Sequence, residues 1–241
     1  MGAVKYEEIY KNLKSRIESG EYEYQELIPS ENTMVTEYSC SRNTVRRAIA
    51  RLADIGYVQS IHGKGVVVIY QPAVQAEFML GGIESLKEAV ARNHQEYTTK
   101  VICFAELTVD KKVRKRTGFP EGMEIYYLQR VRYIDGEALI IDHNYFRRDI
   151  VRDLTAEIAQ KSVYEYMEKV LGEDIVTTKR RMTVERVTQL DEKYMKMNGY
   201  NCVAVVSSVT FNAQGIMFEF TQSRHRPDRF AFFDQAKRVK V

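Results

Sequence analysis

Apolar residues recur at helical spacing through the first 56 residues, in three stretches that helix-ending signals separate. The first stretch ends at Gly20, the second follows a potential N-cap, Ser30, and the third runs from Ser41 to near Gly56. The segment 37–41 between the last two is as short as a helix-turn-helix requires. We therefore predict three short helices. Their buried faces would carry Tyr6, Ile9, Leu13, Ile17, Met34, Val35, Tyr38, Val45, Ala48, Ile49, Leu52 and Ile55.

A β-hairpin is predicted directly after the third helix. Two short runs of β-forming residues, 57–60 and 66–70, flank the glycine-rich segment Ile61-His62-Gly63-Lys64-Gly65. This segment lacks the spacing of a phosphate-binding P-loop. Three helices followed by a two-stranded wing form a winged helix-turn-helix, so we predict that residues 1–70 make one domain of this fold.

Charge is distributed unevenly within this first domain. The whole chain carries 36 basic and 33 acidic side chains, a net charge of only +3. Residues 1–37 have four basic and eight acidic side chains, whereas residues 38–70 have five basic and one acidic. Local clustering of this kind is typical of a surface that faces nucleic-acid phosphates. If only the charges are considered, the alternative to a DNA-binding surface is a helix face that simply contacts solvent.

The residue types in this basic block suit the reading of DNA. Arginine makes phosphate contacts and bidentate contacts to guanine, and asparagine pairs with adenine. Short hydroxyl side chains and backbone N–H groups at a helix start bind phosphates, and a Gly-Lys-Gly tip can approach a groove closely. The predicted DNA-binding residues are Ser30, Ser41, Arg42, Asn43, Thr44, Arg46, Arg47, His62, Gly63, Lys64 and Gly65.

Residues 81–241 are predicted to form a second domain, after a linker at 71–80 that shows no clear periodicity. Strands dominate this domain and short turns join most neighbours, so the sheet should be largely antiparallel and the whole chain α+β. The predicted strands are 98–109, 124–134, 138–146, 175–187, 202–212 and 216–224, and the predicted helices are 83–93, 162–171 and 191–197.

The hairpin around Asp135-Gly136 has two possible registers. A two-residue loop would place Arg130 opposite Ile141, which mixes charged with apolar side chains. A three-residue loop, 135–137, shifts the pairing by one and places Asp142 opposite Arg130. We predict the second register, with Val131, Tyr133, Leu139 and Ile141 on one face and Arg130, Arg132 and Asp142 on the other.

Two arginines on one strand face are suited to hold a phosphate or a carboxylate. The alternative is that Arg130 and Arg132 belong to an exposed polar face that pairs with Asp142. Ser162 is a predicted helix N-cap, and helix starts attract anions. Glu219 and His225 share a face of their strand with Thr221 and Ser223, and such donors and acceptors suit sugar hydroxyls.

The first domain resembles the DNA-binding domain of the GntR family of bacterial transcription regulators. The motifs that carry this resemblance are Ile28-Pro29-Ser30-Glu31, Ser41-Arg42-Asn43-Thr44-Val45-Arg46-Arg47-Ala48 and Gly56-Tyr57-Val58 with Gly63-Lys64-Gly65. They lie in the family's order and spacing, although Ile28 stands where the family usually has leucine. The resemblance implies DNA contacts from Ser30, Arg42, Thr44, Arg46 and Arg47 and from the wing.

The second domain resembles the effector domain of the HutC-type branch of this family, the UTRA domain, which has a chorismate-lyase-like fold. The resemblance rests on the Arg130-x-Arg132 strand, on Ser162-Val163-Tyr164 and on the segment from Phe218 to Phe230. It implies that Arg130, Arg132 and Ser162 hold a phosphate and that Asp142, Glu219 and His225 contact a sugar. Some members have tyrosine at position 225 and glutamate at position 142.

The resemblance further implies a homodimeric repressor of a sugar-utilisation operon, released from double-stranded operator DNA by a sugar phosphate, here expected to be trehalose 6-phosphate. An amino-sugar phosphate, a carboxylate such as urocanate, or a fatty acid remains an alternative effector. A lyase-like enzyme is a further alternative, but the sequence offers no placed nucleophile and base.

The sequence gives no sign of export, of membrane insertion or of a bound metal or cofactor. No apolar run approaches the roughly 20 residues that span a bilayer, and no apolar segment begins the chain. Cys40, Cys103 and Cys202 are odd in number and far apart, which fits neither a disulfide framework nor a zinc site. We therefore expect a cytoplasmic protein with no metal, no cofactor and no membrane partner.

Overall fold

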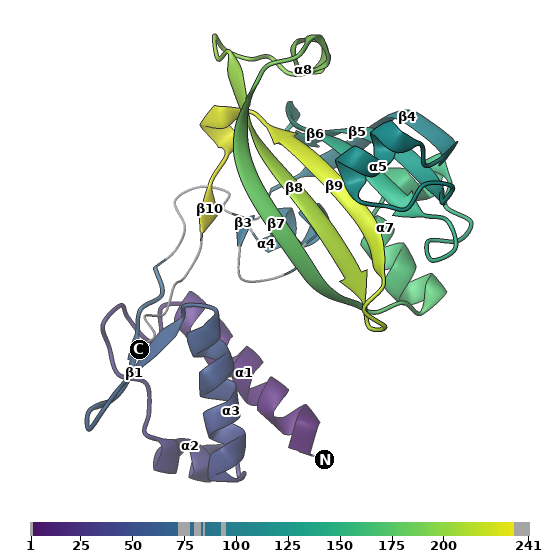
Figure 1. Ribbon diagram of the computed structural model, residues 1–241. Coiled ribbons are helices and arrows are strands. Elements are labelled where there is room, and N and C mark those ends of the chain that lie inside the picture. The colour runs from purple at the N-terminus through teal and green to yellow at the C-terminus, as the bar shows by residue number, and fades with distance from the viewer. Residues whose placement is uncertain (1, 72–77, 80–82, 84, 93–94, 234–241) are drawn as a thin grey trace, which may run out of the picture. The chain divides into compact units, whose positions relative to one another are not determined.

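The computed structural model describes residues 2–71, 78–79, 83, 85–92 and 95–233. The chain divides into two compact units, one of helices with a small hairpin and one built on a six-stranded sheet (Figure 1). Of the predicted linker, 71–80, all but Gln71 and the short strand β3 (Phe78–Met79) lies outside the described residues. Strand β3 pairs with β10 (Phe232–Phe233).

The first unit begins with the three predicted helices. They are α1 (Gly2–Glu18), α2 (Glu31–Glu37) and α3 (Arg42–Asp54). Ser30 and Ser41 are N-caps as predicted, because each side chain accepts a hydrogen bond from the backbone N–H three residues later, at Thr33 and Thr44. Ile9, Leu13, Met34, Val45, Ala48 and Leu52 have no solvent exposure and form the core between the helices.

The predicted wing is the antiparallel hairpin of β1 (Val58–Ile61) and β2 (Gly65–Val68). Its tip needs left-handed backbone, with φ of 72° at Gly63 and 124° at Gly65, and glycine adopts such angles without a Cβ clash. The winged helix-turn-helix expected from the sequence is therefore the fold of this unit.

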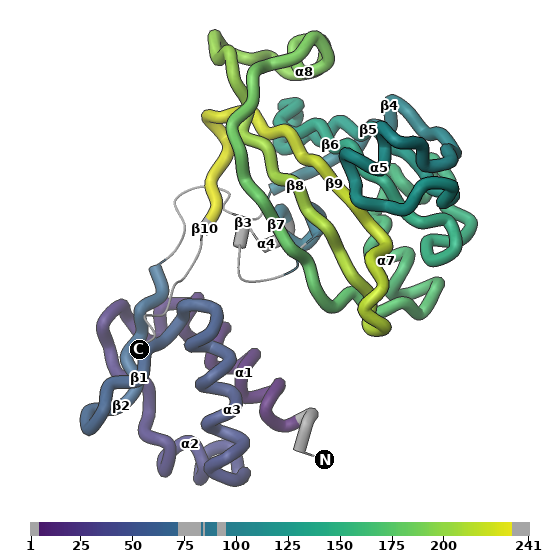
Figure 2. The backbone as a smooth tube through the Cα atoms, in the orientation of Figure 1, coloured from purple at the N-terminus to yellow at the C-terminus, as the bar shows by residue number. Residues whose placement is uncertain are grey.

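The second unit contains an antiparallel six-stranded sheet in the order β4-β5-β6-β9-β8-β7. All six strands were predicted, each to within one residue at either end, and the tube in Figure 2 shows β7, β8 and β9 side by side. The strands are β4 (Tyr97–Thr108), β5 (Glu124–Ile134), β6 (Glu137–Arg147), β7 (Ile175–Arg186), β8 (Cys202–Asn212) and β9 (Met217–His225).

The helices of this unit differ more from the prediction. The predicted single helix at 162–171 is one α-helical turn, α7 (Val163–Tyr166), followed by a π-helical turn, η1 (Met167–Leu171). Two short helices, α5 (Lys111–Thr117) and α6 (Ala156–Gln160), were not predicted. The other helices are α4 (Leu86–Arg92), α8 (Gln189–Tyr194) and the 3₁₀ turn η2 (Pro227–Arg229).

Two helix starts shifted because of capping. Ser85 caps α4, since its side chain accepts from the N–H of Glu88, so this helix begins later than predicted. Thr188 and Asp191 form a capping box, so α8 begins earlier than predicted.

The β5–β6 hairpin combines the two registers considered above. Arg130 lies opposite Asp142, as predicted, but Ile134 pairs with Glu137 and leaves a two-residue loop at Asp135-Gly136. The predicted three-residue loop is therefore wrong. The register shifts between Arg132 and Tyr133, where Leu139 is the extra residue of a bulge. Both turn residues have positive φ, 50° and 80°, which matches the twist that favours two-residue hairpin loops.

The bulge also changes the face of one side chain. Leu139 packs with Ile134, Ile140 and Val90 of α4, rather than with Val131 and Ile141 as predicted. This correction leaves the Arg130 and Asp142 pairing unchanged.

Helices cover both faces of the sheet. On the face that carries Arg130 and Asp142, residues of α6, α7 and η1 pack against Leu128 and Phe146. On the opposite face, the α5 end packs with Tyr145 and Phe220, and the region of α8 packs with Val131 and Ile141. The polar cluster described below thus lies between the sheet and the α6–α7 segment.

Candidate functional site

The predicted DNA-binding residues lie on exposed parts of α2, α3 and the wing. Ten of the eleven are exposed, and Thr44 is half-buried. The opposite side of α3 is apolar and buried, so the polar side faces outward. Ser41, Arg42 and Asn43 at the start of α3 are therefore exposed.

The three candidate arginines of α3 have different surroundings. Arg46 donates from Nε to both carboxylate oxygens of Glu31, at 3.0 and 2.9 Å. The Arg47 guanidinium lies 3.9 Å from the ring centroid of Tyr6 in α1. Arg42 makes no hydrogen bond or ion pair within the described part of the chain. Arg47 therefore lies against α1, whereas Arg42 and Arg46 are exposed and make no hydrogen bond, ion pair or ring contact with α1 among the described residues.

The two predicted serine contacts are both occupied as caps. The Ser30 hydroxyl also lies 2.8 Å from the Thr33 hydroxyl, and the Ser41 hydroxyl lies 2.9 Å from that of Thr44. Either hydroxyl of each serine–threonine pair can be the donor to the other, so one hydroxyl hydrogen of each pair is available to a phosphate.

In the second unit, the register of three strands brings five of the six predicted effector residues to one sheet, and Ser162 lies at the start of α7. Arg130 lies opposite Asp142, which lies opposite Ser223, and Arg132 is in the next row with Ile140 and His225. Alternation therefore directs these side chains to one face of the sheet.

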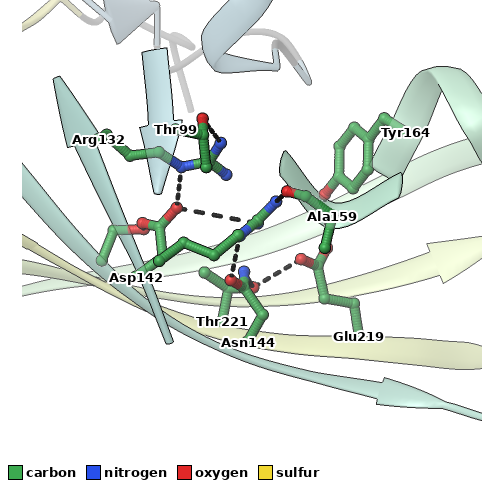
Figure 3. A network of polar contacts seen from close by, with 10 residues as sticks. Thr99, Arg132, Asp142, Asn144, Ala159, Tyr164, Glu219 and Thr221 are labelled. Carbon is green, nitrogen blue, oxygen red and sulfur yellow. Dashed lines mark hydrogen bonds and ion pairs between the residues drawn. The ribbon is translucent and has the colours of Figure 1, made fainter. Parts of the chain in front are cut away.

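Asp142 joins the two arginines. It accepts a hydrogen bond from Arg132 Nε at 2.8 Å, and the side chain of Arg130 approaches it with Nη2 at 3.8 Å (Figure 3). It also accepts a hydrogen bond from the Ser223 hydroxyl at 2.7 Å. Arg132 also donates to the Thr99 hydroxyl at 2.7 Å. Arg130 and Arg132 are only 5% and 7% exposed, so the alternative of a solvent-exposed polar face is wrong, although the pairing with Asp142 is present.

The network continues from Arg130 to Glu219. Arg130 donates to Asn144 and to the carbonyl of Ala159 in α6, at 2.9 and 3.3 Å. Asn144 donates to Thr221, and Glu219 accepts from Thr221 and from Tyr164 of α7, each at 2.6 Å (Figure 3). The α6–α7 segment is thereby tied to the sheet at both ends of the network.

Both guanidiniums keep donors for a ligand. Within the described residues, Arg130 and Arg132 each use Nε and Nη1 in hydrogen bonds, while neither Nη2 makes one. Each Nη2 carries two N–H groups. Two buried arginines with unused donors on one sheet face can bind an anion bidentately.

The two remaining predicted effector residues are Ser162, which makes no hydrogen bond to this network among the described residues, and His225, which interacts electrostatically with Asp142. Ser162 caps α7 by accepting from the N–H of Glu165 at 3.3 Å, as predicted, and follows Ala159 by three residues. The ring of His225 lies 5.0 Å from that of Phe230 and shares a register row with Arg132.

The electrostatics keep the arginine–aspartate cluster charged. Burial alone would raise the pKa of Asp142, but Arg132, Arg130 and the hydrogen bond from Ser223 hold this pKa below its usual range. Burial and the Arg132 charge lower the pKa of Arg130 to about 9, so Arg130 is still charged at neutral pH.

Tyr164 and His225, two further buried groups of the site, are neutral at neutral pH. Burial, reinforced by Glu219, raises the pKa of Tyr164 well above its usual range, so this residue remains a hydroxyl donor. Burial lowers the pKa of His225 to about 4, although Asp142 opposes this shift. His225 therefore presents an uncharged ring at neutral pH.

Sequence reasoning missed Thr99, Asn144, Tyr164 and the carbonyl of Ala159. Asn144 could have been found, because it lies two residues after Asp142 on one strand and shares its face. Tyr164 and Ala159 belong to short helices, and their docking against β9 and β5 leaves no periodic signal in the sequence.

The residues that the structure describes include neither a membrane-spanning helix nor a metal-binding cluster of side chains. No helix there is long and apolar enough to cross a membrane. No group of three or more His, Cys, Asp and Glu side chains in these same residues could hold a metal ion.

Two family models match this chain. The model of bacterial regulatory proteins of the gntR family matches residues 5–68, and the UTRA domain model matches residues 92–231, more than half of the chain. The chain therefore belongs to the GntR-family regulators that carry a UTRA domain. It is similar to the HTH-type transcriptional regulator TreR of Bacillus subtilis (strain 168), with 36% identity over 236 residues and 98% of each chain covered.

Solved structures agree with this assignment. The effector binding domain of the B. subtilis trehalose repressor TreR matches with 35% identity and a TM-score of 0.54, covering 59% of this chain and 99% of that domain. The possible transcriptional regulator YydK of B. subtilis matches with 21% identity and a TM-score of 0.82 over 97% of this chain and 99% of its own, which supports the fold. The relatives are named regulators, so this chain is a transcriptional regulator and not an enzyme.

Proposed function

We propose that this regulator is a repressor of a sugar-utilisation operon, released from its operator by a sugar phosphate, specifically trehalose 6-phosphate. Residues 1–70 would bind DNA, 71–80 would link the domains, and 81–241 would bind the effector and form a cytoplasmic homodimer. The observation that carries the effector class is the buried Arg130 and Arg132 pair, whose Nη2 donors make no hydrogen bond among the described residues.

The rest of the site supports a phosphorylated sugar over a bare anion. Asp142, Glu219 and neutral His225 line the same sheet face and offer acceptors for sugar hydroxyls, while Ser162 stands at a helix start. The similarity to a protein named the trehalose repressor supports trehalose as the sugar.

Repression by this route needs two linked equilibria. A homodimer would place two winged domains on a roughly palindromic operator, with half-sites about one helical turn (~34 Å) or a multiple apart. The effector must bind the arrangement that is off DNA more tightly than the DNA-bound one, and a coupling of about 1–3 kcal/mol is typical. Effector binding would then release the DNA from the wing and from the α3 residues Arg42, Asn43, Thr44, Arg46 and Arg47.

Calorimetric titration of the full chain tests the effector. We expect trehalose 6-phosphate to bind at least about 100-fold more tightly than free trehalose, because the two Nη2 donors contribute only when an anion is present. Glucosamine 6-phosphate should bind more weakly than trehalose 6-phosphate. Equal binding of free trehalose would contradict the arginine clamp, and tighter binding of glucosamine 6-phosphate or urocanate would replace the proposed effector.

A further inference from the structure

The contact between Glu31 and Arg46 joins the two helices of the helix-turn-helix on their exposed side. Glu31 is the first residue of α2, and Arg46 lies in the second turn of α3. The side chains are 34% and 61% exposed, and both carboxylate oxygens accept from Arg46 Nε.

The fold does not need this ion pair. The helices α2 and α3 already share a core that contains Met34, Val45 and Ile49. An exposed ion pair adds little to the stability of such a core, since water and salt screen it. Its effect must be sought in the orientation of the two side chains.

The contact with Glu31 leaves the two Nη groups of Arg46 available to a base. A guanidinium has five N–H donors, one on Nε and two on each Nη. Glu31 occupies the Nε donor, while Nη1 and Nη2 make no hydrogen bond to any residue that the structure describes. Two parallel Nη donors match the O6 and N7 acceptors of guanine in the major groove.

Arg46 differs in this respect from its neighbours. Arg42 has no partner in the described residues that would fix it, and Arg47 is stacked on Tyr6. Among these three, Arg46 is the one whose guanidinium is held by a carboxylate of the helix-turn-helix itself, through Nε, with both Nη groups unused.

We propose that Glu31 is a positioning residue that fixes the Arg46 guanidinium for base recognition, and so determines sequence specificity at one base pair in each half-site. This inference rests on the proposed DNA-binding role of α3. A carboxylate on a DNA-facing surface repels phosphates, so Glu31 lowers affinity for DNA of any sequence while it raises discrimination between sequences.

In vitro selection from a random duplex library with the full-length protein, followed by affinity measurements on the selected site and its single-base variants, tests the proposal. Arg46→Ala identifies the base pair whose discrimination depends on Arg46. We expect Glu31→Gln to reduce discrimination at this same base pair about tenfold and to leave or raise affinity for unrelated DNA. In the Arg46→Ala background, Glu31→Gln should produce no further loss, because Glu31 acts through Arg46.

Glu37→Gln is the matched control, because Glu37 is also on α2 and pairs with an arginine, Arg16 of α1, at 2.9 Å. It should leave every base preference unchanged. The proposal is overturned if Glu31→Gln keeps the discrimination, if it weakens all positions equally, or if Arg46→Ala changes no single base pair. A wild-type protein that enriches no sequence overturns the proposed DNA-binding function as well, which separates the two failures.

Discussion

Replacing Arg130 with methionine is expected to weaken the binding of trehalose 6-phosphate by about 100-fold and to leave a protein that still binds its operator. A hydrogen bond to a charged group contributes about 1.5–3 kcal/mol, and about 1.4 kcal/mol corresponds to a factor of ten in affinity. Arg130 would supply such bonds through Nη2. Calorimetry on the variant measures the loss, and anisotropy on operator DNA should show an unchanged affinity within about threefold.

Arg130 is the better target because Asp142 keeps a partner without it. Arg132 makes the 2.8 Å hydrogen bond to Asp142, so its removal would leave this buried carboxylate with only the 3.8 Å ion pair to Arg130 and the hydrogen bond from Ser223, which would destabilise the fold. Arg130→Lys retains the charge but not the planar fork, and should also bind weakly.

Arg181→Met is a matched control for the loss of one positive charge from the sheet. Arg181 is exposed on β7, and alternation places it on the face opposite Arg130. The Arg181→Met variant should bind trehalose 6-phosphate with the affinity of the wild type. Normal effector binding by Arg130→Met would show that the arginine pair only holds Asp142.

The stability of the second unit should fall by about 2 kcal/mol between pH 7 and pH 5, through His225. Its pKa is about 4 when folded and about 6.5 when unfolded, so the unfolded chain takes up the proton first as the pH falls. The stabilisation is present above pH 6.5 and is lost as the pH decreases towards 4. Urea unfolding at both pH values measures it.

His225→Gln isolates this effect, because the variant should lose about 2 kcal/mol less than the wild type over the same interval. Asp142 also has a lowered pKa, but the stability that its charged form provides is lost only below about pH 5, outside this interval. The buried His143 also has a lowered pKa and contributes in the same direction to both proteins. Parallel pH profiles for wild type and variant would mean that His225 is accessible to protons in the folded state.

Much of the scaffold was predictable because local chemistry determines it. Ser30 and Ser41 set the starts of α2 and α3, and the separation of charged from apolar faces identified the pairing of Arg130 with Asp142. The same reasoning could not predict the two-residue loop together with the bulge at Leu139. It treated the two registers as exclusive, whereas a bulge allows the favoured turn and the separation of faces to occur in one hairpin.

The parts of the site that were missed depend on tertiary docking. Asp110 and Gly118 are cap signals for α5, but the sequence KKVRKRT between them lacks a helical apolar pattern. The contacts of Tyr164 with Glu219 and of Arg47 with Tyr6 join elements far apart in the chain. Their residue types and spacing alone do not indicate that they meet.

The central claim is that occupation of the arginine site weakens DNA binding by the same protein. Fluorescence anisotropy of the full chain on its selected operator, with and without saturating trehalose 6-phosphate, measures this coupling directly. We predict that the effector raises the operator dissociation constant by about 5- to 150-fold, the range that 1–3 kcal/mol of coupling gives, and that free trehalose does not. An operator affinity that stays the same when trehalose 6-phosphate is bound would contradict the account.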